Sequence, residues 1–573
     1  RLVPRELPHR QSASLLALDE KRPDEIRRSL GLASYRALGY VPGDREGESV
    51  SKTLEYAYDD WCIARMAKAL GEESDYARYI ERAQHYKNLF DPSTGFMRPR
   101  VNGAFAEPFD PSEVNAHFTE ANSWQYSFYV PQDVEGLMSL MGGPEAFEAK
   151  LDSLFAASPR TTGREQPDIT GLIGQYAHGN EPSHHVAYLY AYAGRRWKTE
   201  ERVREIMETL YGEGPAGLCG NEDCGQMSAW YVLSALGFYP VTPGQEAYVV
   251  GSPLFREASI DVGGGKRFVV RANRVSRANR HIQSATLRGE PYAKGYIDHG
   301  EIMAGGELVF TMGPRPNEAW GTSAADRPRS SIDEHLIMPV PYVSSGSRIF
   351  SDSTVVGLAS VVPGAEIRYT LSETPPDGDA TLYESPFVLR ASTPLRAVAR
   401  AEGFPQSRVL AADFRKVPGG RRVRLETAYS PQYTAGGALG LIDEIRGGVD
   451  FRAGGWQGYH GVDLVAVVDL GSVRRVRRVA ASFLQDQNSW IFLPERIEYS
   501  LSSDGVAFIT VAEWDRGTPA ADEAARIEEF STDRVARSAR FVRVHARNAG
   551  VCPPWHPYAG EKAWIFVDEI EVE

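Results

Sequence analysis

The hydrophobic pattern of this chain changes its period at Pro240, and that change limits the folds the chain can adopt. From about residue 50 to Pro240, apolar residues recur at helical spacing. One such stripe consists of Leu54, Tyr58, Trp61, Cys62 and Met66. After Pro240, short β-branched runs such as Tyr248-Val249-Val250 alternate with glycines, as is typical of strands. The pattern predicts helices followed by sheets, in a multidomain α + β fold.

The length of 573 residues exceeds what one hydrophobic core supports, and a prior of roughly 150 residues per domain suggests three or four domains. The segment from Pro314 to Pro341 is rich in Pro, Ser and charged residues and is predicted to be a linker. A charged joint follows at 415–420. The predicted domains are a helical part at 1–240, a β-sandwich with its linker at 241–335, a small β-module at 336–416 and an all-β module at 420–573.

The charge balance argues against a nucleic-acid partner. The chain has 76 acidic and 63 basic residues, a formal net charge of -13, whereas proteins that grip phosphates carry basic surfaces. No stretch of about 18 apolar residues predicts a membrane span, and the N-terminus lacks the pattern of a signal peptide. The four cysteines are too few for a disulfide scaffold; Cys219 and Cys224 could form one bridge or remain small thiols.

Three polar loops in the helical part combine a carboxylate with amides, hydroxyls or aromatic rings. They lie at 118–126, 178–185 and 217–225. Aromatic rings suit the C–H face of a sugar, and amides and carboxylates suit its hydroxyls. The three loops therefore predict a carbohydrate site.

Glu120 and Asp223 are the candidates for acid and base chemistry in these loops. Glycoside hydrolysis needs one protonated carboxyl group to release the leaving oxygen and one ionised carboxylate. The neighbours Trp124 and Tyr126 are expected to raise the pKa of Glu120 by desolvation. Asp223 follows polar Asn221 and Glu222, which favour ionisation. Each acid could instead cap a helix or lie on the surface.

Asn180, Glu181 and Gln125 offer oxygen ligands, so a metal at this site should be a hard cation such as calcium. The adjacent His184 and His185 are expected to be packed or hydrogen-bonded, because neighbours on a helix point about 100° apart and rarely share a metal.

Glu55 and Asp59 share one helix face at i, i+4, where their charges repel each other. We interpret both as structural residues, with lining of the site as the alternative.

With these segments in view, the chain resembles the bacterial exo-α-mannosidases of glycoside hydrolase family 92. The resemblance extends over roughly residues 30–315. It is carried by the stretches at 49–61, 95–100, 118–126, 179–185 and 220–240.

The resemblance implies an (α/α)6 barrel joined to a β-sandwich, and calcium-dependent inversion that releases terminal mannose from α-mannosides, with α-1,2 linkages of N-glycans or mannan as the expected substrate. It implies Glu120 as general acid and Asp223 as general base. The expected substrate contacts are Asn180, Glu181, Asn221 and Trp124, and the expected calcium ligands are Gln125, Asn180 and Glu181. A secreted, periplasmic or cell-surface location is expected.

The barrel implied by the resemblance is incomplete at the N-terminus, so a separate N-terminal polypeptide or fragment could complete it. Residues 336–416 resemble the β-modules of bacterial hexosaminidases, and 420–573 are similar to discoidin-like carbohydrate-binding modules with a jelly-roll fold. Trp490, Trp555 and Tyr558 are either sugar platforms or core residues of that module.

Two other functions remain open from the sequence. In one, the chain is a non-catalytic carbohydrate-binding protein in which only the C-terminal module binds sugar. In the other, it is a glycosidase of different specificity, such as an α-glucosidase.

Overall fold

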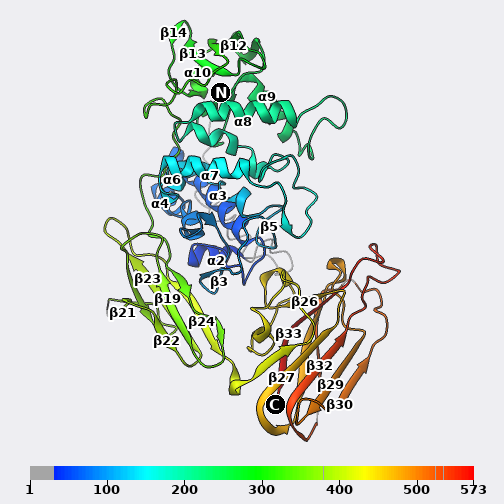
Figure 1. The fold of residues 1–573 in the computed structure, drawn as a ribbon. Coiled ribbons are helices and arrows are strands. Elements are labelled where there is room, and N and C mark those ends of the chain that lie inside the picture. Colours follow the sequence, from blue (N-terminus) through cyan, green and yellow to red (C-terminus); the bar gives the residue numbers. More distant parts are fainter. Residues whose placement is uncertain (1–30, 379, 523, 533–534) are drawn as a thin grey trace.

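The computed structural model describes residues 31–573 except residues 379, 523, 533 and 534. The helices occupy the middle of the molecule (Figure 1). A sheet-bearing part lies above them, and two β modules lie below, one on each side. The order of the elements follows the predicted change from helix to strand at Pro240.

The helical part is built around α3, which is the longest of its helices. Its helices are α2 (Gly31–Leu38), α3 (Ser49–Leu70), α4 (Glu73–Arg82), α5 (Ser123–Tyr126), α6 (Val134–Leu140), α7 (Pro144–Ala156), α8 (Arg196–Thr209) and α9 (Gln226–Leu236). The 3-10 segments η4 (Glu181–Ser183) and η5 (Val186–Ala191) lie between α7 and α8. Short β1 (Phe90–Asp91) and β2 (Phe96–Met97) form a hairpin beside α5.

The predicted apolar stripe on α3 is only partly buried. Leu54 and Trp61 lie in the core, as expected. Cys62 and Met66 are exposed, so the prediction is wrong at the C-terminal half of the helix. The described residues therefore leave an apolar strip of α3 facing outward.

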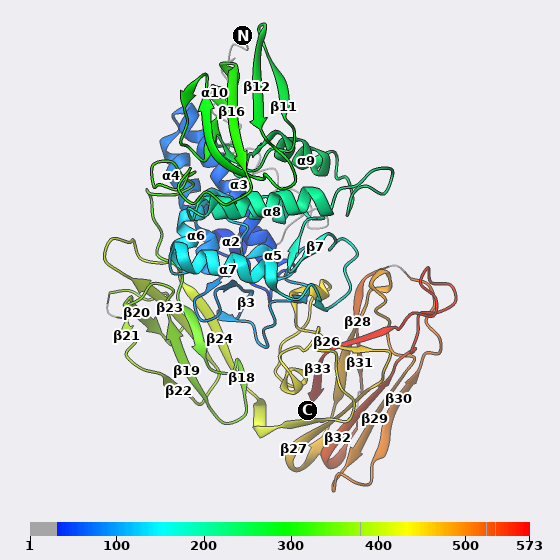
Figure 2. The same ribbon diagram turned by 45° about the horizontal axis from the view of Figure 1, so that its top comes forward.

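The sheet-bearing part above the helices contains a five-stranded and a three-stranded sheet. In spatial order, the first has β11 (Glu257–Gly263), β12 (Lys266–Asn273), β16 (Gly306–Gly313), β13 (His281–Leu287) and β14 (Glu290–Pro291). The second has β15 (Tyr296–Asp298), β10 (Ala247–Val250) and β9 (Phe238–Tyr239). Figure 2 shows β11, β12 and β16 rising from the side of α8 and α9.

The buried carboxylate of Glu200 joins α8 to this part. Arg196 and Glu200 are fully buried and pair with each other. Glu200 also accepts from the backbone N–H of Ile282 at 2.9 Å and lies 3.0 Å from Nδ1 of His281. Because removing one partner would leave a buried charge unpaired, this joint holds the sheet firmly on the helices.

The predicted linker is not a free connection. It carries no regular element between β16 and β17, but Ile332, Met338 and Val340 are buried against the helical part. Its Pro and Ser residues predicted an irregular backbone correctly, whereas its apolar residues anchor that backbone to a core.

The small β module shares a sheet with the helical part. That sheet has the order β22 (Phe387–Leu389), β19 (Thr354–Ala359), β17 (Tyr342–Ser345), β4 (Ala104–Phe105) and β3 (Arg100–Val101), with Val343 paired to Ala104 in parallel. The second sheet has β18 (Ile349–Phe350), β24 (Leu410–Lys416), β23 (Thr393–Arg400), β20 (Glu366–Thr370) and β21 (Thr381–Leu382).

The C-terminal module is a sandwich of two sheets. One has β25 (Arg422–Leu425), β27 (Leu464–Val476), β32 (Arg537–Arg547), β29 (Arg496–Ser502) and β30 (Ile509–Asp515). The other has β26 (Gln457–His460), β33 (Trp564–Val572), β28 (Val479–Gln485) and β31 (Arg526–Ser531). Alternate residues of both sheets, such as Val468, Phe483 and Val542, form a shared core.

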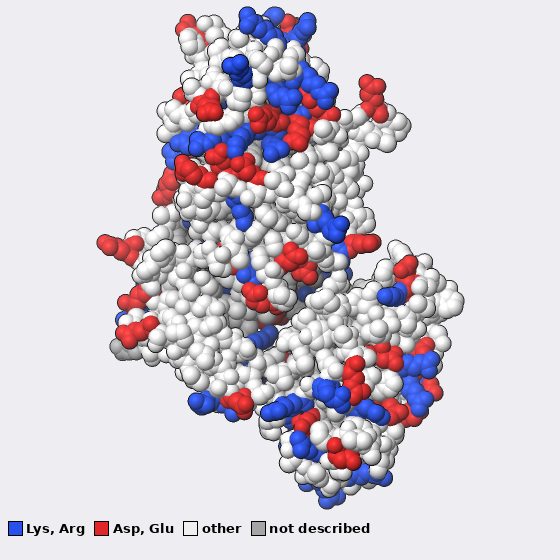
Figure 3. Space-filling view, viewed as in Figure 1, with Lys and Arg blue, Asp and Glu red and all other residues white. Residues whose placement is uncertain are grey.

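Basic and acidic side chains are interspersed on the face shown in Figure 3. Across the described residues, no helix has both the length and the apolar character needed to cross a bilayer.

Candidate active site

A pocket of about 440 Å³ lies where α3, the loop before α5, η4 and the start of α9 meet. This volume is within the range of about 300–1,000 Å³ typical of small-ligand sites. The residues that line it are Glu55, Tyr58, Thr119, Glu120, Tyr126, Tyr129, Pro131, Asn180, Glu181, Pro182, His184, His185, Gln226, Tyr239, Pro240, Val241 and Pro243. Two of the three predicted loops therefore contribute directly to one pocket.

Hydrogen bonds of the backbone at Thr119 and Glu120 hold Glu120 in the pocket wall. The N–H of Thr119 donates to Oγ of Ser51 at 2.9 Å, and Nδ2 of Asn180 donates to the carbonyl oxygen of Glu120 at 2.8 Å. The φ of Glu120 is 48°, a left-handed conformation that non-glycine residues adopt rarely and that is often found at functional sites.

Burial raises the pKa of Glu120, and the charges of Asp168 and Asp223 raise it further. The predicted direction is confirmed, but one apolar neighbour proposed from the sequence is not next to the carboxyl group. Of the two predicted neighbours, Tyr126 lines the pocket with Glu120, whereas the ring of Trp124 packs edge-on against Phe96, with 4.6 Å between centroids, and does not line it.

Asp223 lies on a turn directly before α9, beside Glu181 but outside the pocket lining. Its φ is 50° and that of Cys224 is 56°, and Gly225 with φ 97° leads into the helix. Burial raises the pKa of Glu181, and the neighbouring carboxyl groups of Asp223 and Glu120 raise it further. Glu120, Glu181 and Asp223 thus lie within electrostatic reach of one another, and we call these three residues the acidic rim.

The surroundings of Glu55 are aromatic, in contrast to the acidic rim. The phenol of Tyr126 donates to Oε1 of Glu55 at 3.5 Å, and the rings of Tyr58, Tyr126 and Tyr129 pack on one another with centroids 5.9–6.3 Å apart. We call Glu55 with these three tyrosines the aromatic wall. Burial raises the pKa of Glu55 to about 7.

We interpreted Glu55 from the sequence as a structural residue, with lining of the site as the alternative. The structure shows that its side chain lines the pocket. A usable signal was present, because Glu55 and Tyr58 are separated by three residues and so share a helix face. Asp59, on the same helix, is exposed and does not line the pocket.

Two further predicted contacts lie away from the pocket lining. Gln125 is buried and completes a capping box, in which its side-chain oxygen accepts the N–H of Asn122 at 3.1 Å. Asn221 is exposed, and its Nδ2 donates to Oδ1 of Asp168 at 3.3 Å.

The predicted packing of the histidine pair is confirmed. Nε2 of His184 lies 2.9 Å from the carbonyl oxygen of His178, and Nε2 of His185 lies 2.8 Å from that of Phe128. Burial lowers the pKa of both rings to about 4, so they are neutral at pH 7. Cys219 and Cys224 are free thiols, so the alternative of a bridge between them is not realised.

The donor set at the acidic rim was tested against the expected calcium ion. Its side chains offer only oxygens, which suits a hard cation, and the mutual repulsion of Glu120, Glu181 and Asp223 is a cost that a cation would relieve. The oxygen of Gln125 is occupied by the capping box. Over the described residues, no group of three or more His, Cys, Asp or Glu side chains is arranged as a complete metal site.

Comparison with known proteins identifies two segments. Residues 10–314 match the family model described as the glycosyl hydrolase family 92 catalytic domain. Residues 356–414, in the small β module, match the model described as Fn3 associated.

Three relatives each cover about half of the chain. A GH92 α-mannosidase of Bacteroides thetaiotaomicron, solved in complex with mannoimidazole, is 42% identical with a TM-score of 0.51, over 53% of this chain and 41% of that one. A GH92 inverting mannosidase of Bacteroides thetaiotaomicron VPI-5482 is 41% identical with a TM-score of 0.51, over 56% of this chain and 45% of that one. An uncharacterized secreted glycosidase of Arthroderma benhamiae is 31% identical over 335 residues, 52% of this chain and 41% of that protein. The chain thus spans less than half the length of each of these relatives.

Proposed function

The chain belongs to glycosyl hydrolase family 92, and from that premise we propose that it releases terminal mannose from α-mannosides by a single inverting displacement. The observation that carries the proposal is the acidic rim. Asp223 raises the pKa of Glu120, so the two candidate catalytic acids act on each other beside one pocket of sugar-binding size.

In the proposed reaction, Glu120 is the general acid. Its raised pKa keeps it protonated to higher pH, so it can give its proton to the oxygen of the leaving sugar. Asp223, exposed on the turn before α9, is the general base that takes a proton from the attacking water. Inversion requires about 6.5–9.5 Å between the two carboxyl groups in the substrate complex, which leaves room for that water.

Asn180 and Glu181 are proposed to orient the terminal sugar. Nδ2 of Asn180 is engaged by Glu120, which leaves its side-chain oxygen for a hydroxyl donor. Glu181 presents its carboxylate from the first turn of η4. A preference for α-1,2 linkages, in N-glycans or mannan, is part of the proposal.

We also propose that calcium acts with this site, with Glu181 and Asn180 as its protein ligands. When bound, a calcium ion would polarise sugar hydroxyls and favour a flattened ring. Because calcium takes about six to eight oxygens, hydroxyls of the sugar and water would have to supply most of the shell.

The helical part is proposed to be a portion of an (α/α)6 barrel that another polypeptide or segment completes. The supporting observation is the outward strip of α3, where Ile63, Met66 and Leu70 are 44%, 62% and 69% exposed. Exposed apolar side chains at i, i+3 and i+7 are typical of a helix that packs on a partner. Native mass spectrometry of the protein from its natural source tests this, since a bound partner is expected and a lone chain would contradict it.

The C-terminal sandwich is proposed to be a discoidin-like carbohydrate-binding module of a secreted, periplasmic or cell-surface protein. Trp555 and Tyr558 are 41% and 58% exposed at neighbouring loop positions, and Trp490 packs on Tyr558 with 5.2 Å between ring centroids. Exposed aromatic rings at one end of the sandwich favour stacking on a sugar over a core role for Trp555 and Tyr558.

The proposed activity is tested by incubating the chain with α-1,2-mannobiose and following the product by proton NMR. We expect β-mannose to appear first, and chelation with EDTA to abolish turnover. Appearance of α-mannose first would exclude inversion, and full activity in EDTA would exclude the calcium requirement. Cleavage of maltose in place of mannobiose would identify an α-glucosidase.

A further inference from the structure

A second and larger cavity lies between three parts of the molecule. Its volume is about 1660 Å³, against about 440 Å³ for the pocket beside Glu120. The helical part contributes residues of β3, β4 and the loop at 105–118, the small β module contributes 342–355, and the C-terminal sandwich contributes 431–456. We call this cavity the interdomain cleft. A cavity of this size accommodates several sugar rings rather than one.

Two walls of the interdomain cleft are built as one unit. Besides the pairing of Val343 with Ala104, Nδ2 of Asn102 donates to the carbonyl oxygen of Asp413 at 3.0 Å, and the N–H of Asp413 donates back to Oδ1 of Asn102 at 2.7 Å. Buried Arg100 donates to the carbonyl oxygen of Pro341 at 2.7 Å. These contacts preorganise the cleft, which lowers the cost of ordering it around a ligand.

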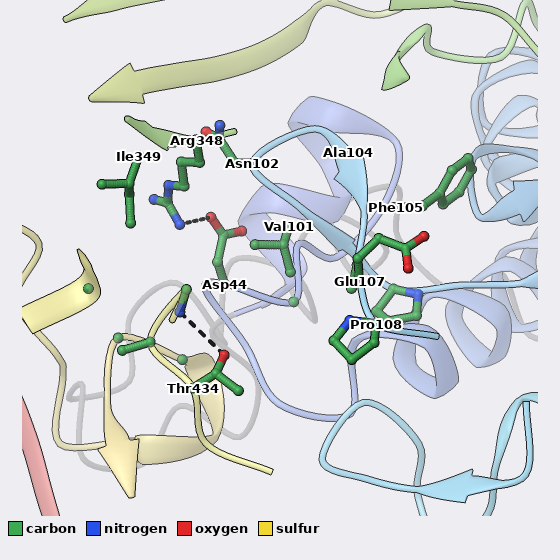
Figure 4. A pocket seen from close by; sticks show the side chains of 18 of the residues that line it. Asp44, Val101, Asn102, Ala104, Phe105, Glu107, Pro108, Arg348, Ile349 and Thr434 are labelled. Carbon is green, nitrogen blue, oxygen red and sulfur yellow. Dashed lines mark hydrogen bonds and ion pairs between the residues drawn. The ribbon is translucent and has the colours of Figure 1, made fainter. Parts of the chain in front are cut away.

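An ion pair also joins the helical part to the small β module, and the third wall is attached to that module through a shared core. Arg348 lies 3.3 Å from Asp44 of the helical part, and Figure 4 shows the two side chains pointing toward each other. The neighbouring Ile349 is buried in the core of the C-terminal sandwich. The small β module therefore holds both other parts in place around the cleft.

The lining has the chemistry of a carbohydrate site. Partly buried aromatic rings line the cleft from two parts, including Phe105, Phe109 and Tyr342, and the hydroxyls of Ser344 and Thr434 line it as well. Phe105 and Thr434 appear on different sides of the cavity in Figure 4. Aromatic faces stack on the C–H surface of sugars, and hydroxyls exchange hydrogen bonds with sugar hydroxyls.

The charges that line the cleft nearly balance, with six acidic and five basic side chains, and several of them form ion pairs. Besides the Asp44–Arg348 pair, Arg98 lies 2.7 Å from Asp91 and 2.8 Å from Glu107. Paired charges give little net attraction for an anion or a cation, so the lining favours a neutral ligand.

The interdomain cleft and the Glu120 pocket lie on adjacent parts of one loop. His117 and Phe118 line the cleft, whereas the next two residues, Thr119 and Glu120, line the pocket. One turn of chain thus separates a site for a terminal sugar from a larger cavity with sugar-like chemistry.

We infer that the interdomain cleft is a second carbohydrate site, which binds a neutral oligosaccharide of several residues independently of the Glu120 pocket and of the C-terminal loops. The inference does not depend on the proposed reaction, because it concerns binding at walls that contain neither Glu120 nor Asp223.

The test uses the full chain carrying Glu120→Gln, which prevents hydrolysis, and Trp555→Ala with Tyr558→Ala, which removes the exposed platform of the C-terminal loops. Binding of α-mannohexaose, mannose and hexagalacturonate is measured by calorimetry. We expect the hexaose to bind at least tenfold more tightly than mannose and at least tenfold more tightly than the acidic hexamer. Equal affinity for mannose and the hexaose, no binding of the hexaose, or preferred binding of the acidic hexamer would overturn the inference.

A filling variant locates the binding. Ser344→Trp places an indole on an exposed cleft residue of β17, and Ser385→Trp places one on an exposed residue of the same module away from the cleft. The first is expected to remove the hexaose advantage, and the second to leave it within twofold. Equal effects of the two would contradict the assignment.

Hydrogen exchange of the otherwise unsubstituted Glu120→Gln chain gives a readout that does not depend on folding of the tryptophan variants. The hexaose is expected to protect 342–347 and 431–436, and protection confined to other segments would overturn the inference. Failure of the proposed reaction has a different signature, since the unmodified chain would then release no mannose while the hexaose still protected the cleft.

Discussion

The acidic rim and the aromatic wall are two sides of one pocket, and both hold acids with raised pKa values. Burial is the first cause on both sides, and neighbouring carboxylates add to it. The two sides differ in their hydrogen bonds, because only on the wall do tyrosine hydroxyls oppose the rise. The rim acids at 120 and 223 stand on loops with left-handed backbone, whereas Glu55 stands inside a long helix. The comparison teaches that the hydrogen-bond partners and the backbone, more than burial, distinguish the acids of one site.

The largest effect should come from the rim acid that we assign as proton donor. Glu120→Gln keeps the shape of the side chain but has no proton to give, and we expect kcat on α-1,2-mannobiose to fall by about 10³–10⁴-fold. Glu222→Gln is the matched control, because Glu222 accepts from Ser228 at the start of α9 and does not line the pocket. Full turnover by the Glu120 variant would remove it from the mechanism.

Asp223→Asn should lower activity by about 10²–10³-fold and should also move the pH profile. The Asp223 charge raises the pKa of Glu120, so its removal lowers that pKa. The reaction needs Glu120 protonated, and the alkaline limb of kcat/KM is therefore expected to shift to lower pH. An unchanged limb in the variant would show that the two rim acids do not interact in the working enzyme.

The wall acid should control stability rather than the pH limb set by Glu120. Burial raises the pKa of Glu55 from its ordinary value of 4.5 to about 7, so between these pH values the folded state holds a proton that the unfolded chain has lost. Stability from this group is complete below pH 4.5 and is lost as pH rises through about 7, by about 2–3 kcal/mol after allowing for partial exposure. Glu55→Gln removes the titration.

The measurement is thermal unfolding of both chains at pH 4.5 and pH 8. The Gln variant is expected to gain stability relative to the unmodified chain at the higher pH. Parallel pH dependence of the two unfolding temperatures would contradict the burial of a proton-binding Glu55. Tyr129→Phe keeps the ring but removes a hydroxyl that lowers the pKa of Glu55, so it is expected to raise that pKa further.

The sequence predicted the parts of the site that depend on local chemistry. The change of period at Pro240 and the helix after Gly225 follow from neighbours along the chain, whereas the raised pKa of Glu120 comes from burial and from the distant carboxylates of Asp168 and Asp223. The aromatic wall was missed because Tyr126 and Tyr129 reach Glu55 from a distant segment, which spacing along α3 cannot reveal. The interdomain cleft depends on the pairing of β4 with β17, about 240 residues apart, and no local pattern encodes that contact.

The smallest effect on catalysis is expected at Trp124, which the sequence placed beside the sugar. Its ring packs on Phe96 and lies 5.1 Å from Nζ of Lys150, behind the loop that carries the rim. Trp124→Ala should lower stability by about 2 kcal/mol through lost packing, while KM for α-1,2-mannobiose stays within twofold. Tyr126→Phe is the comparison from the wall, where the lost hydroxyl faces the pocket and the carboxyl group of Glu55. If Trp124→Ala raised KM more than tenfold and left the unfolding temperature unchanged, the ring would have to turn toward the sugar when substrate binds. The pocket would then have a mobile side in addition to the acidic rim and the aromatic wall.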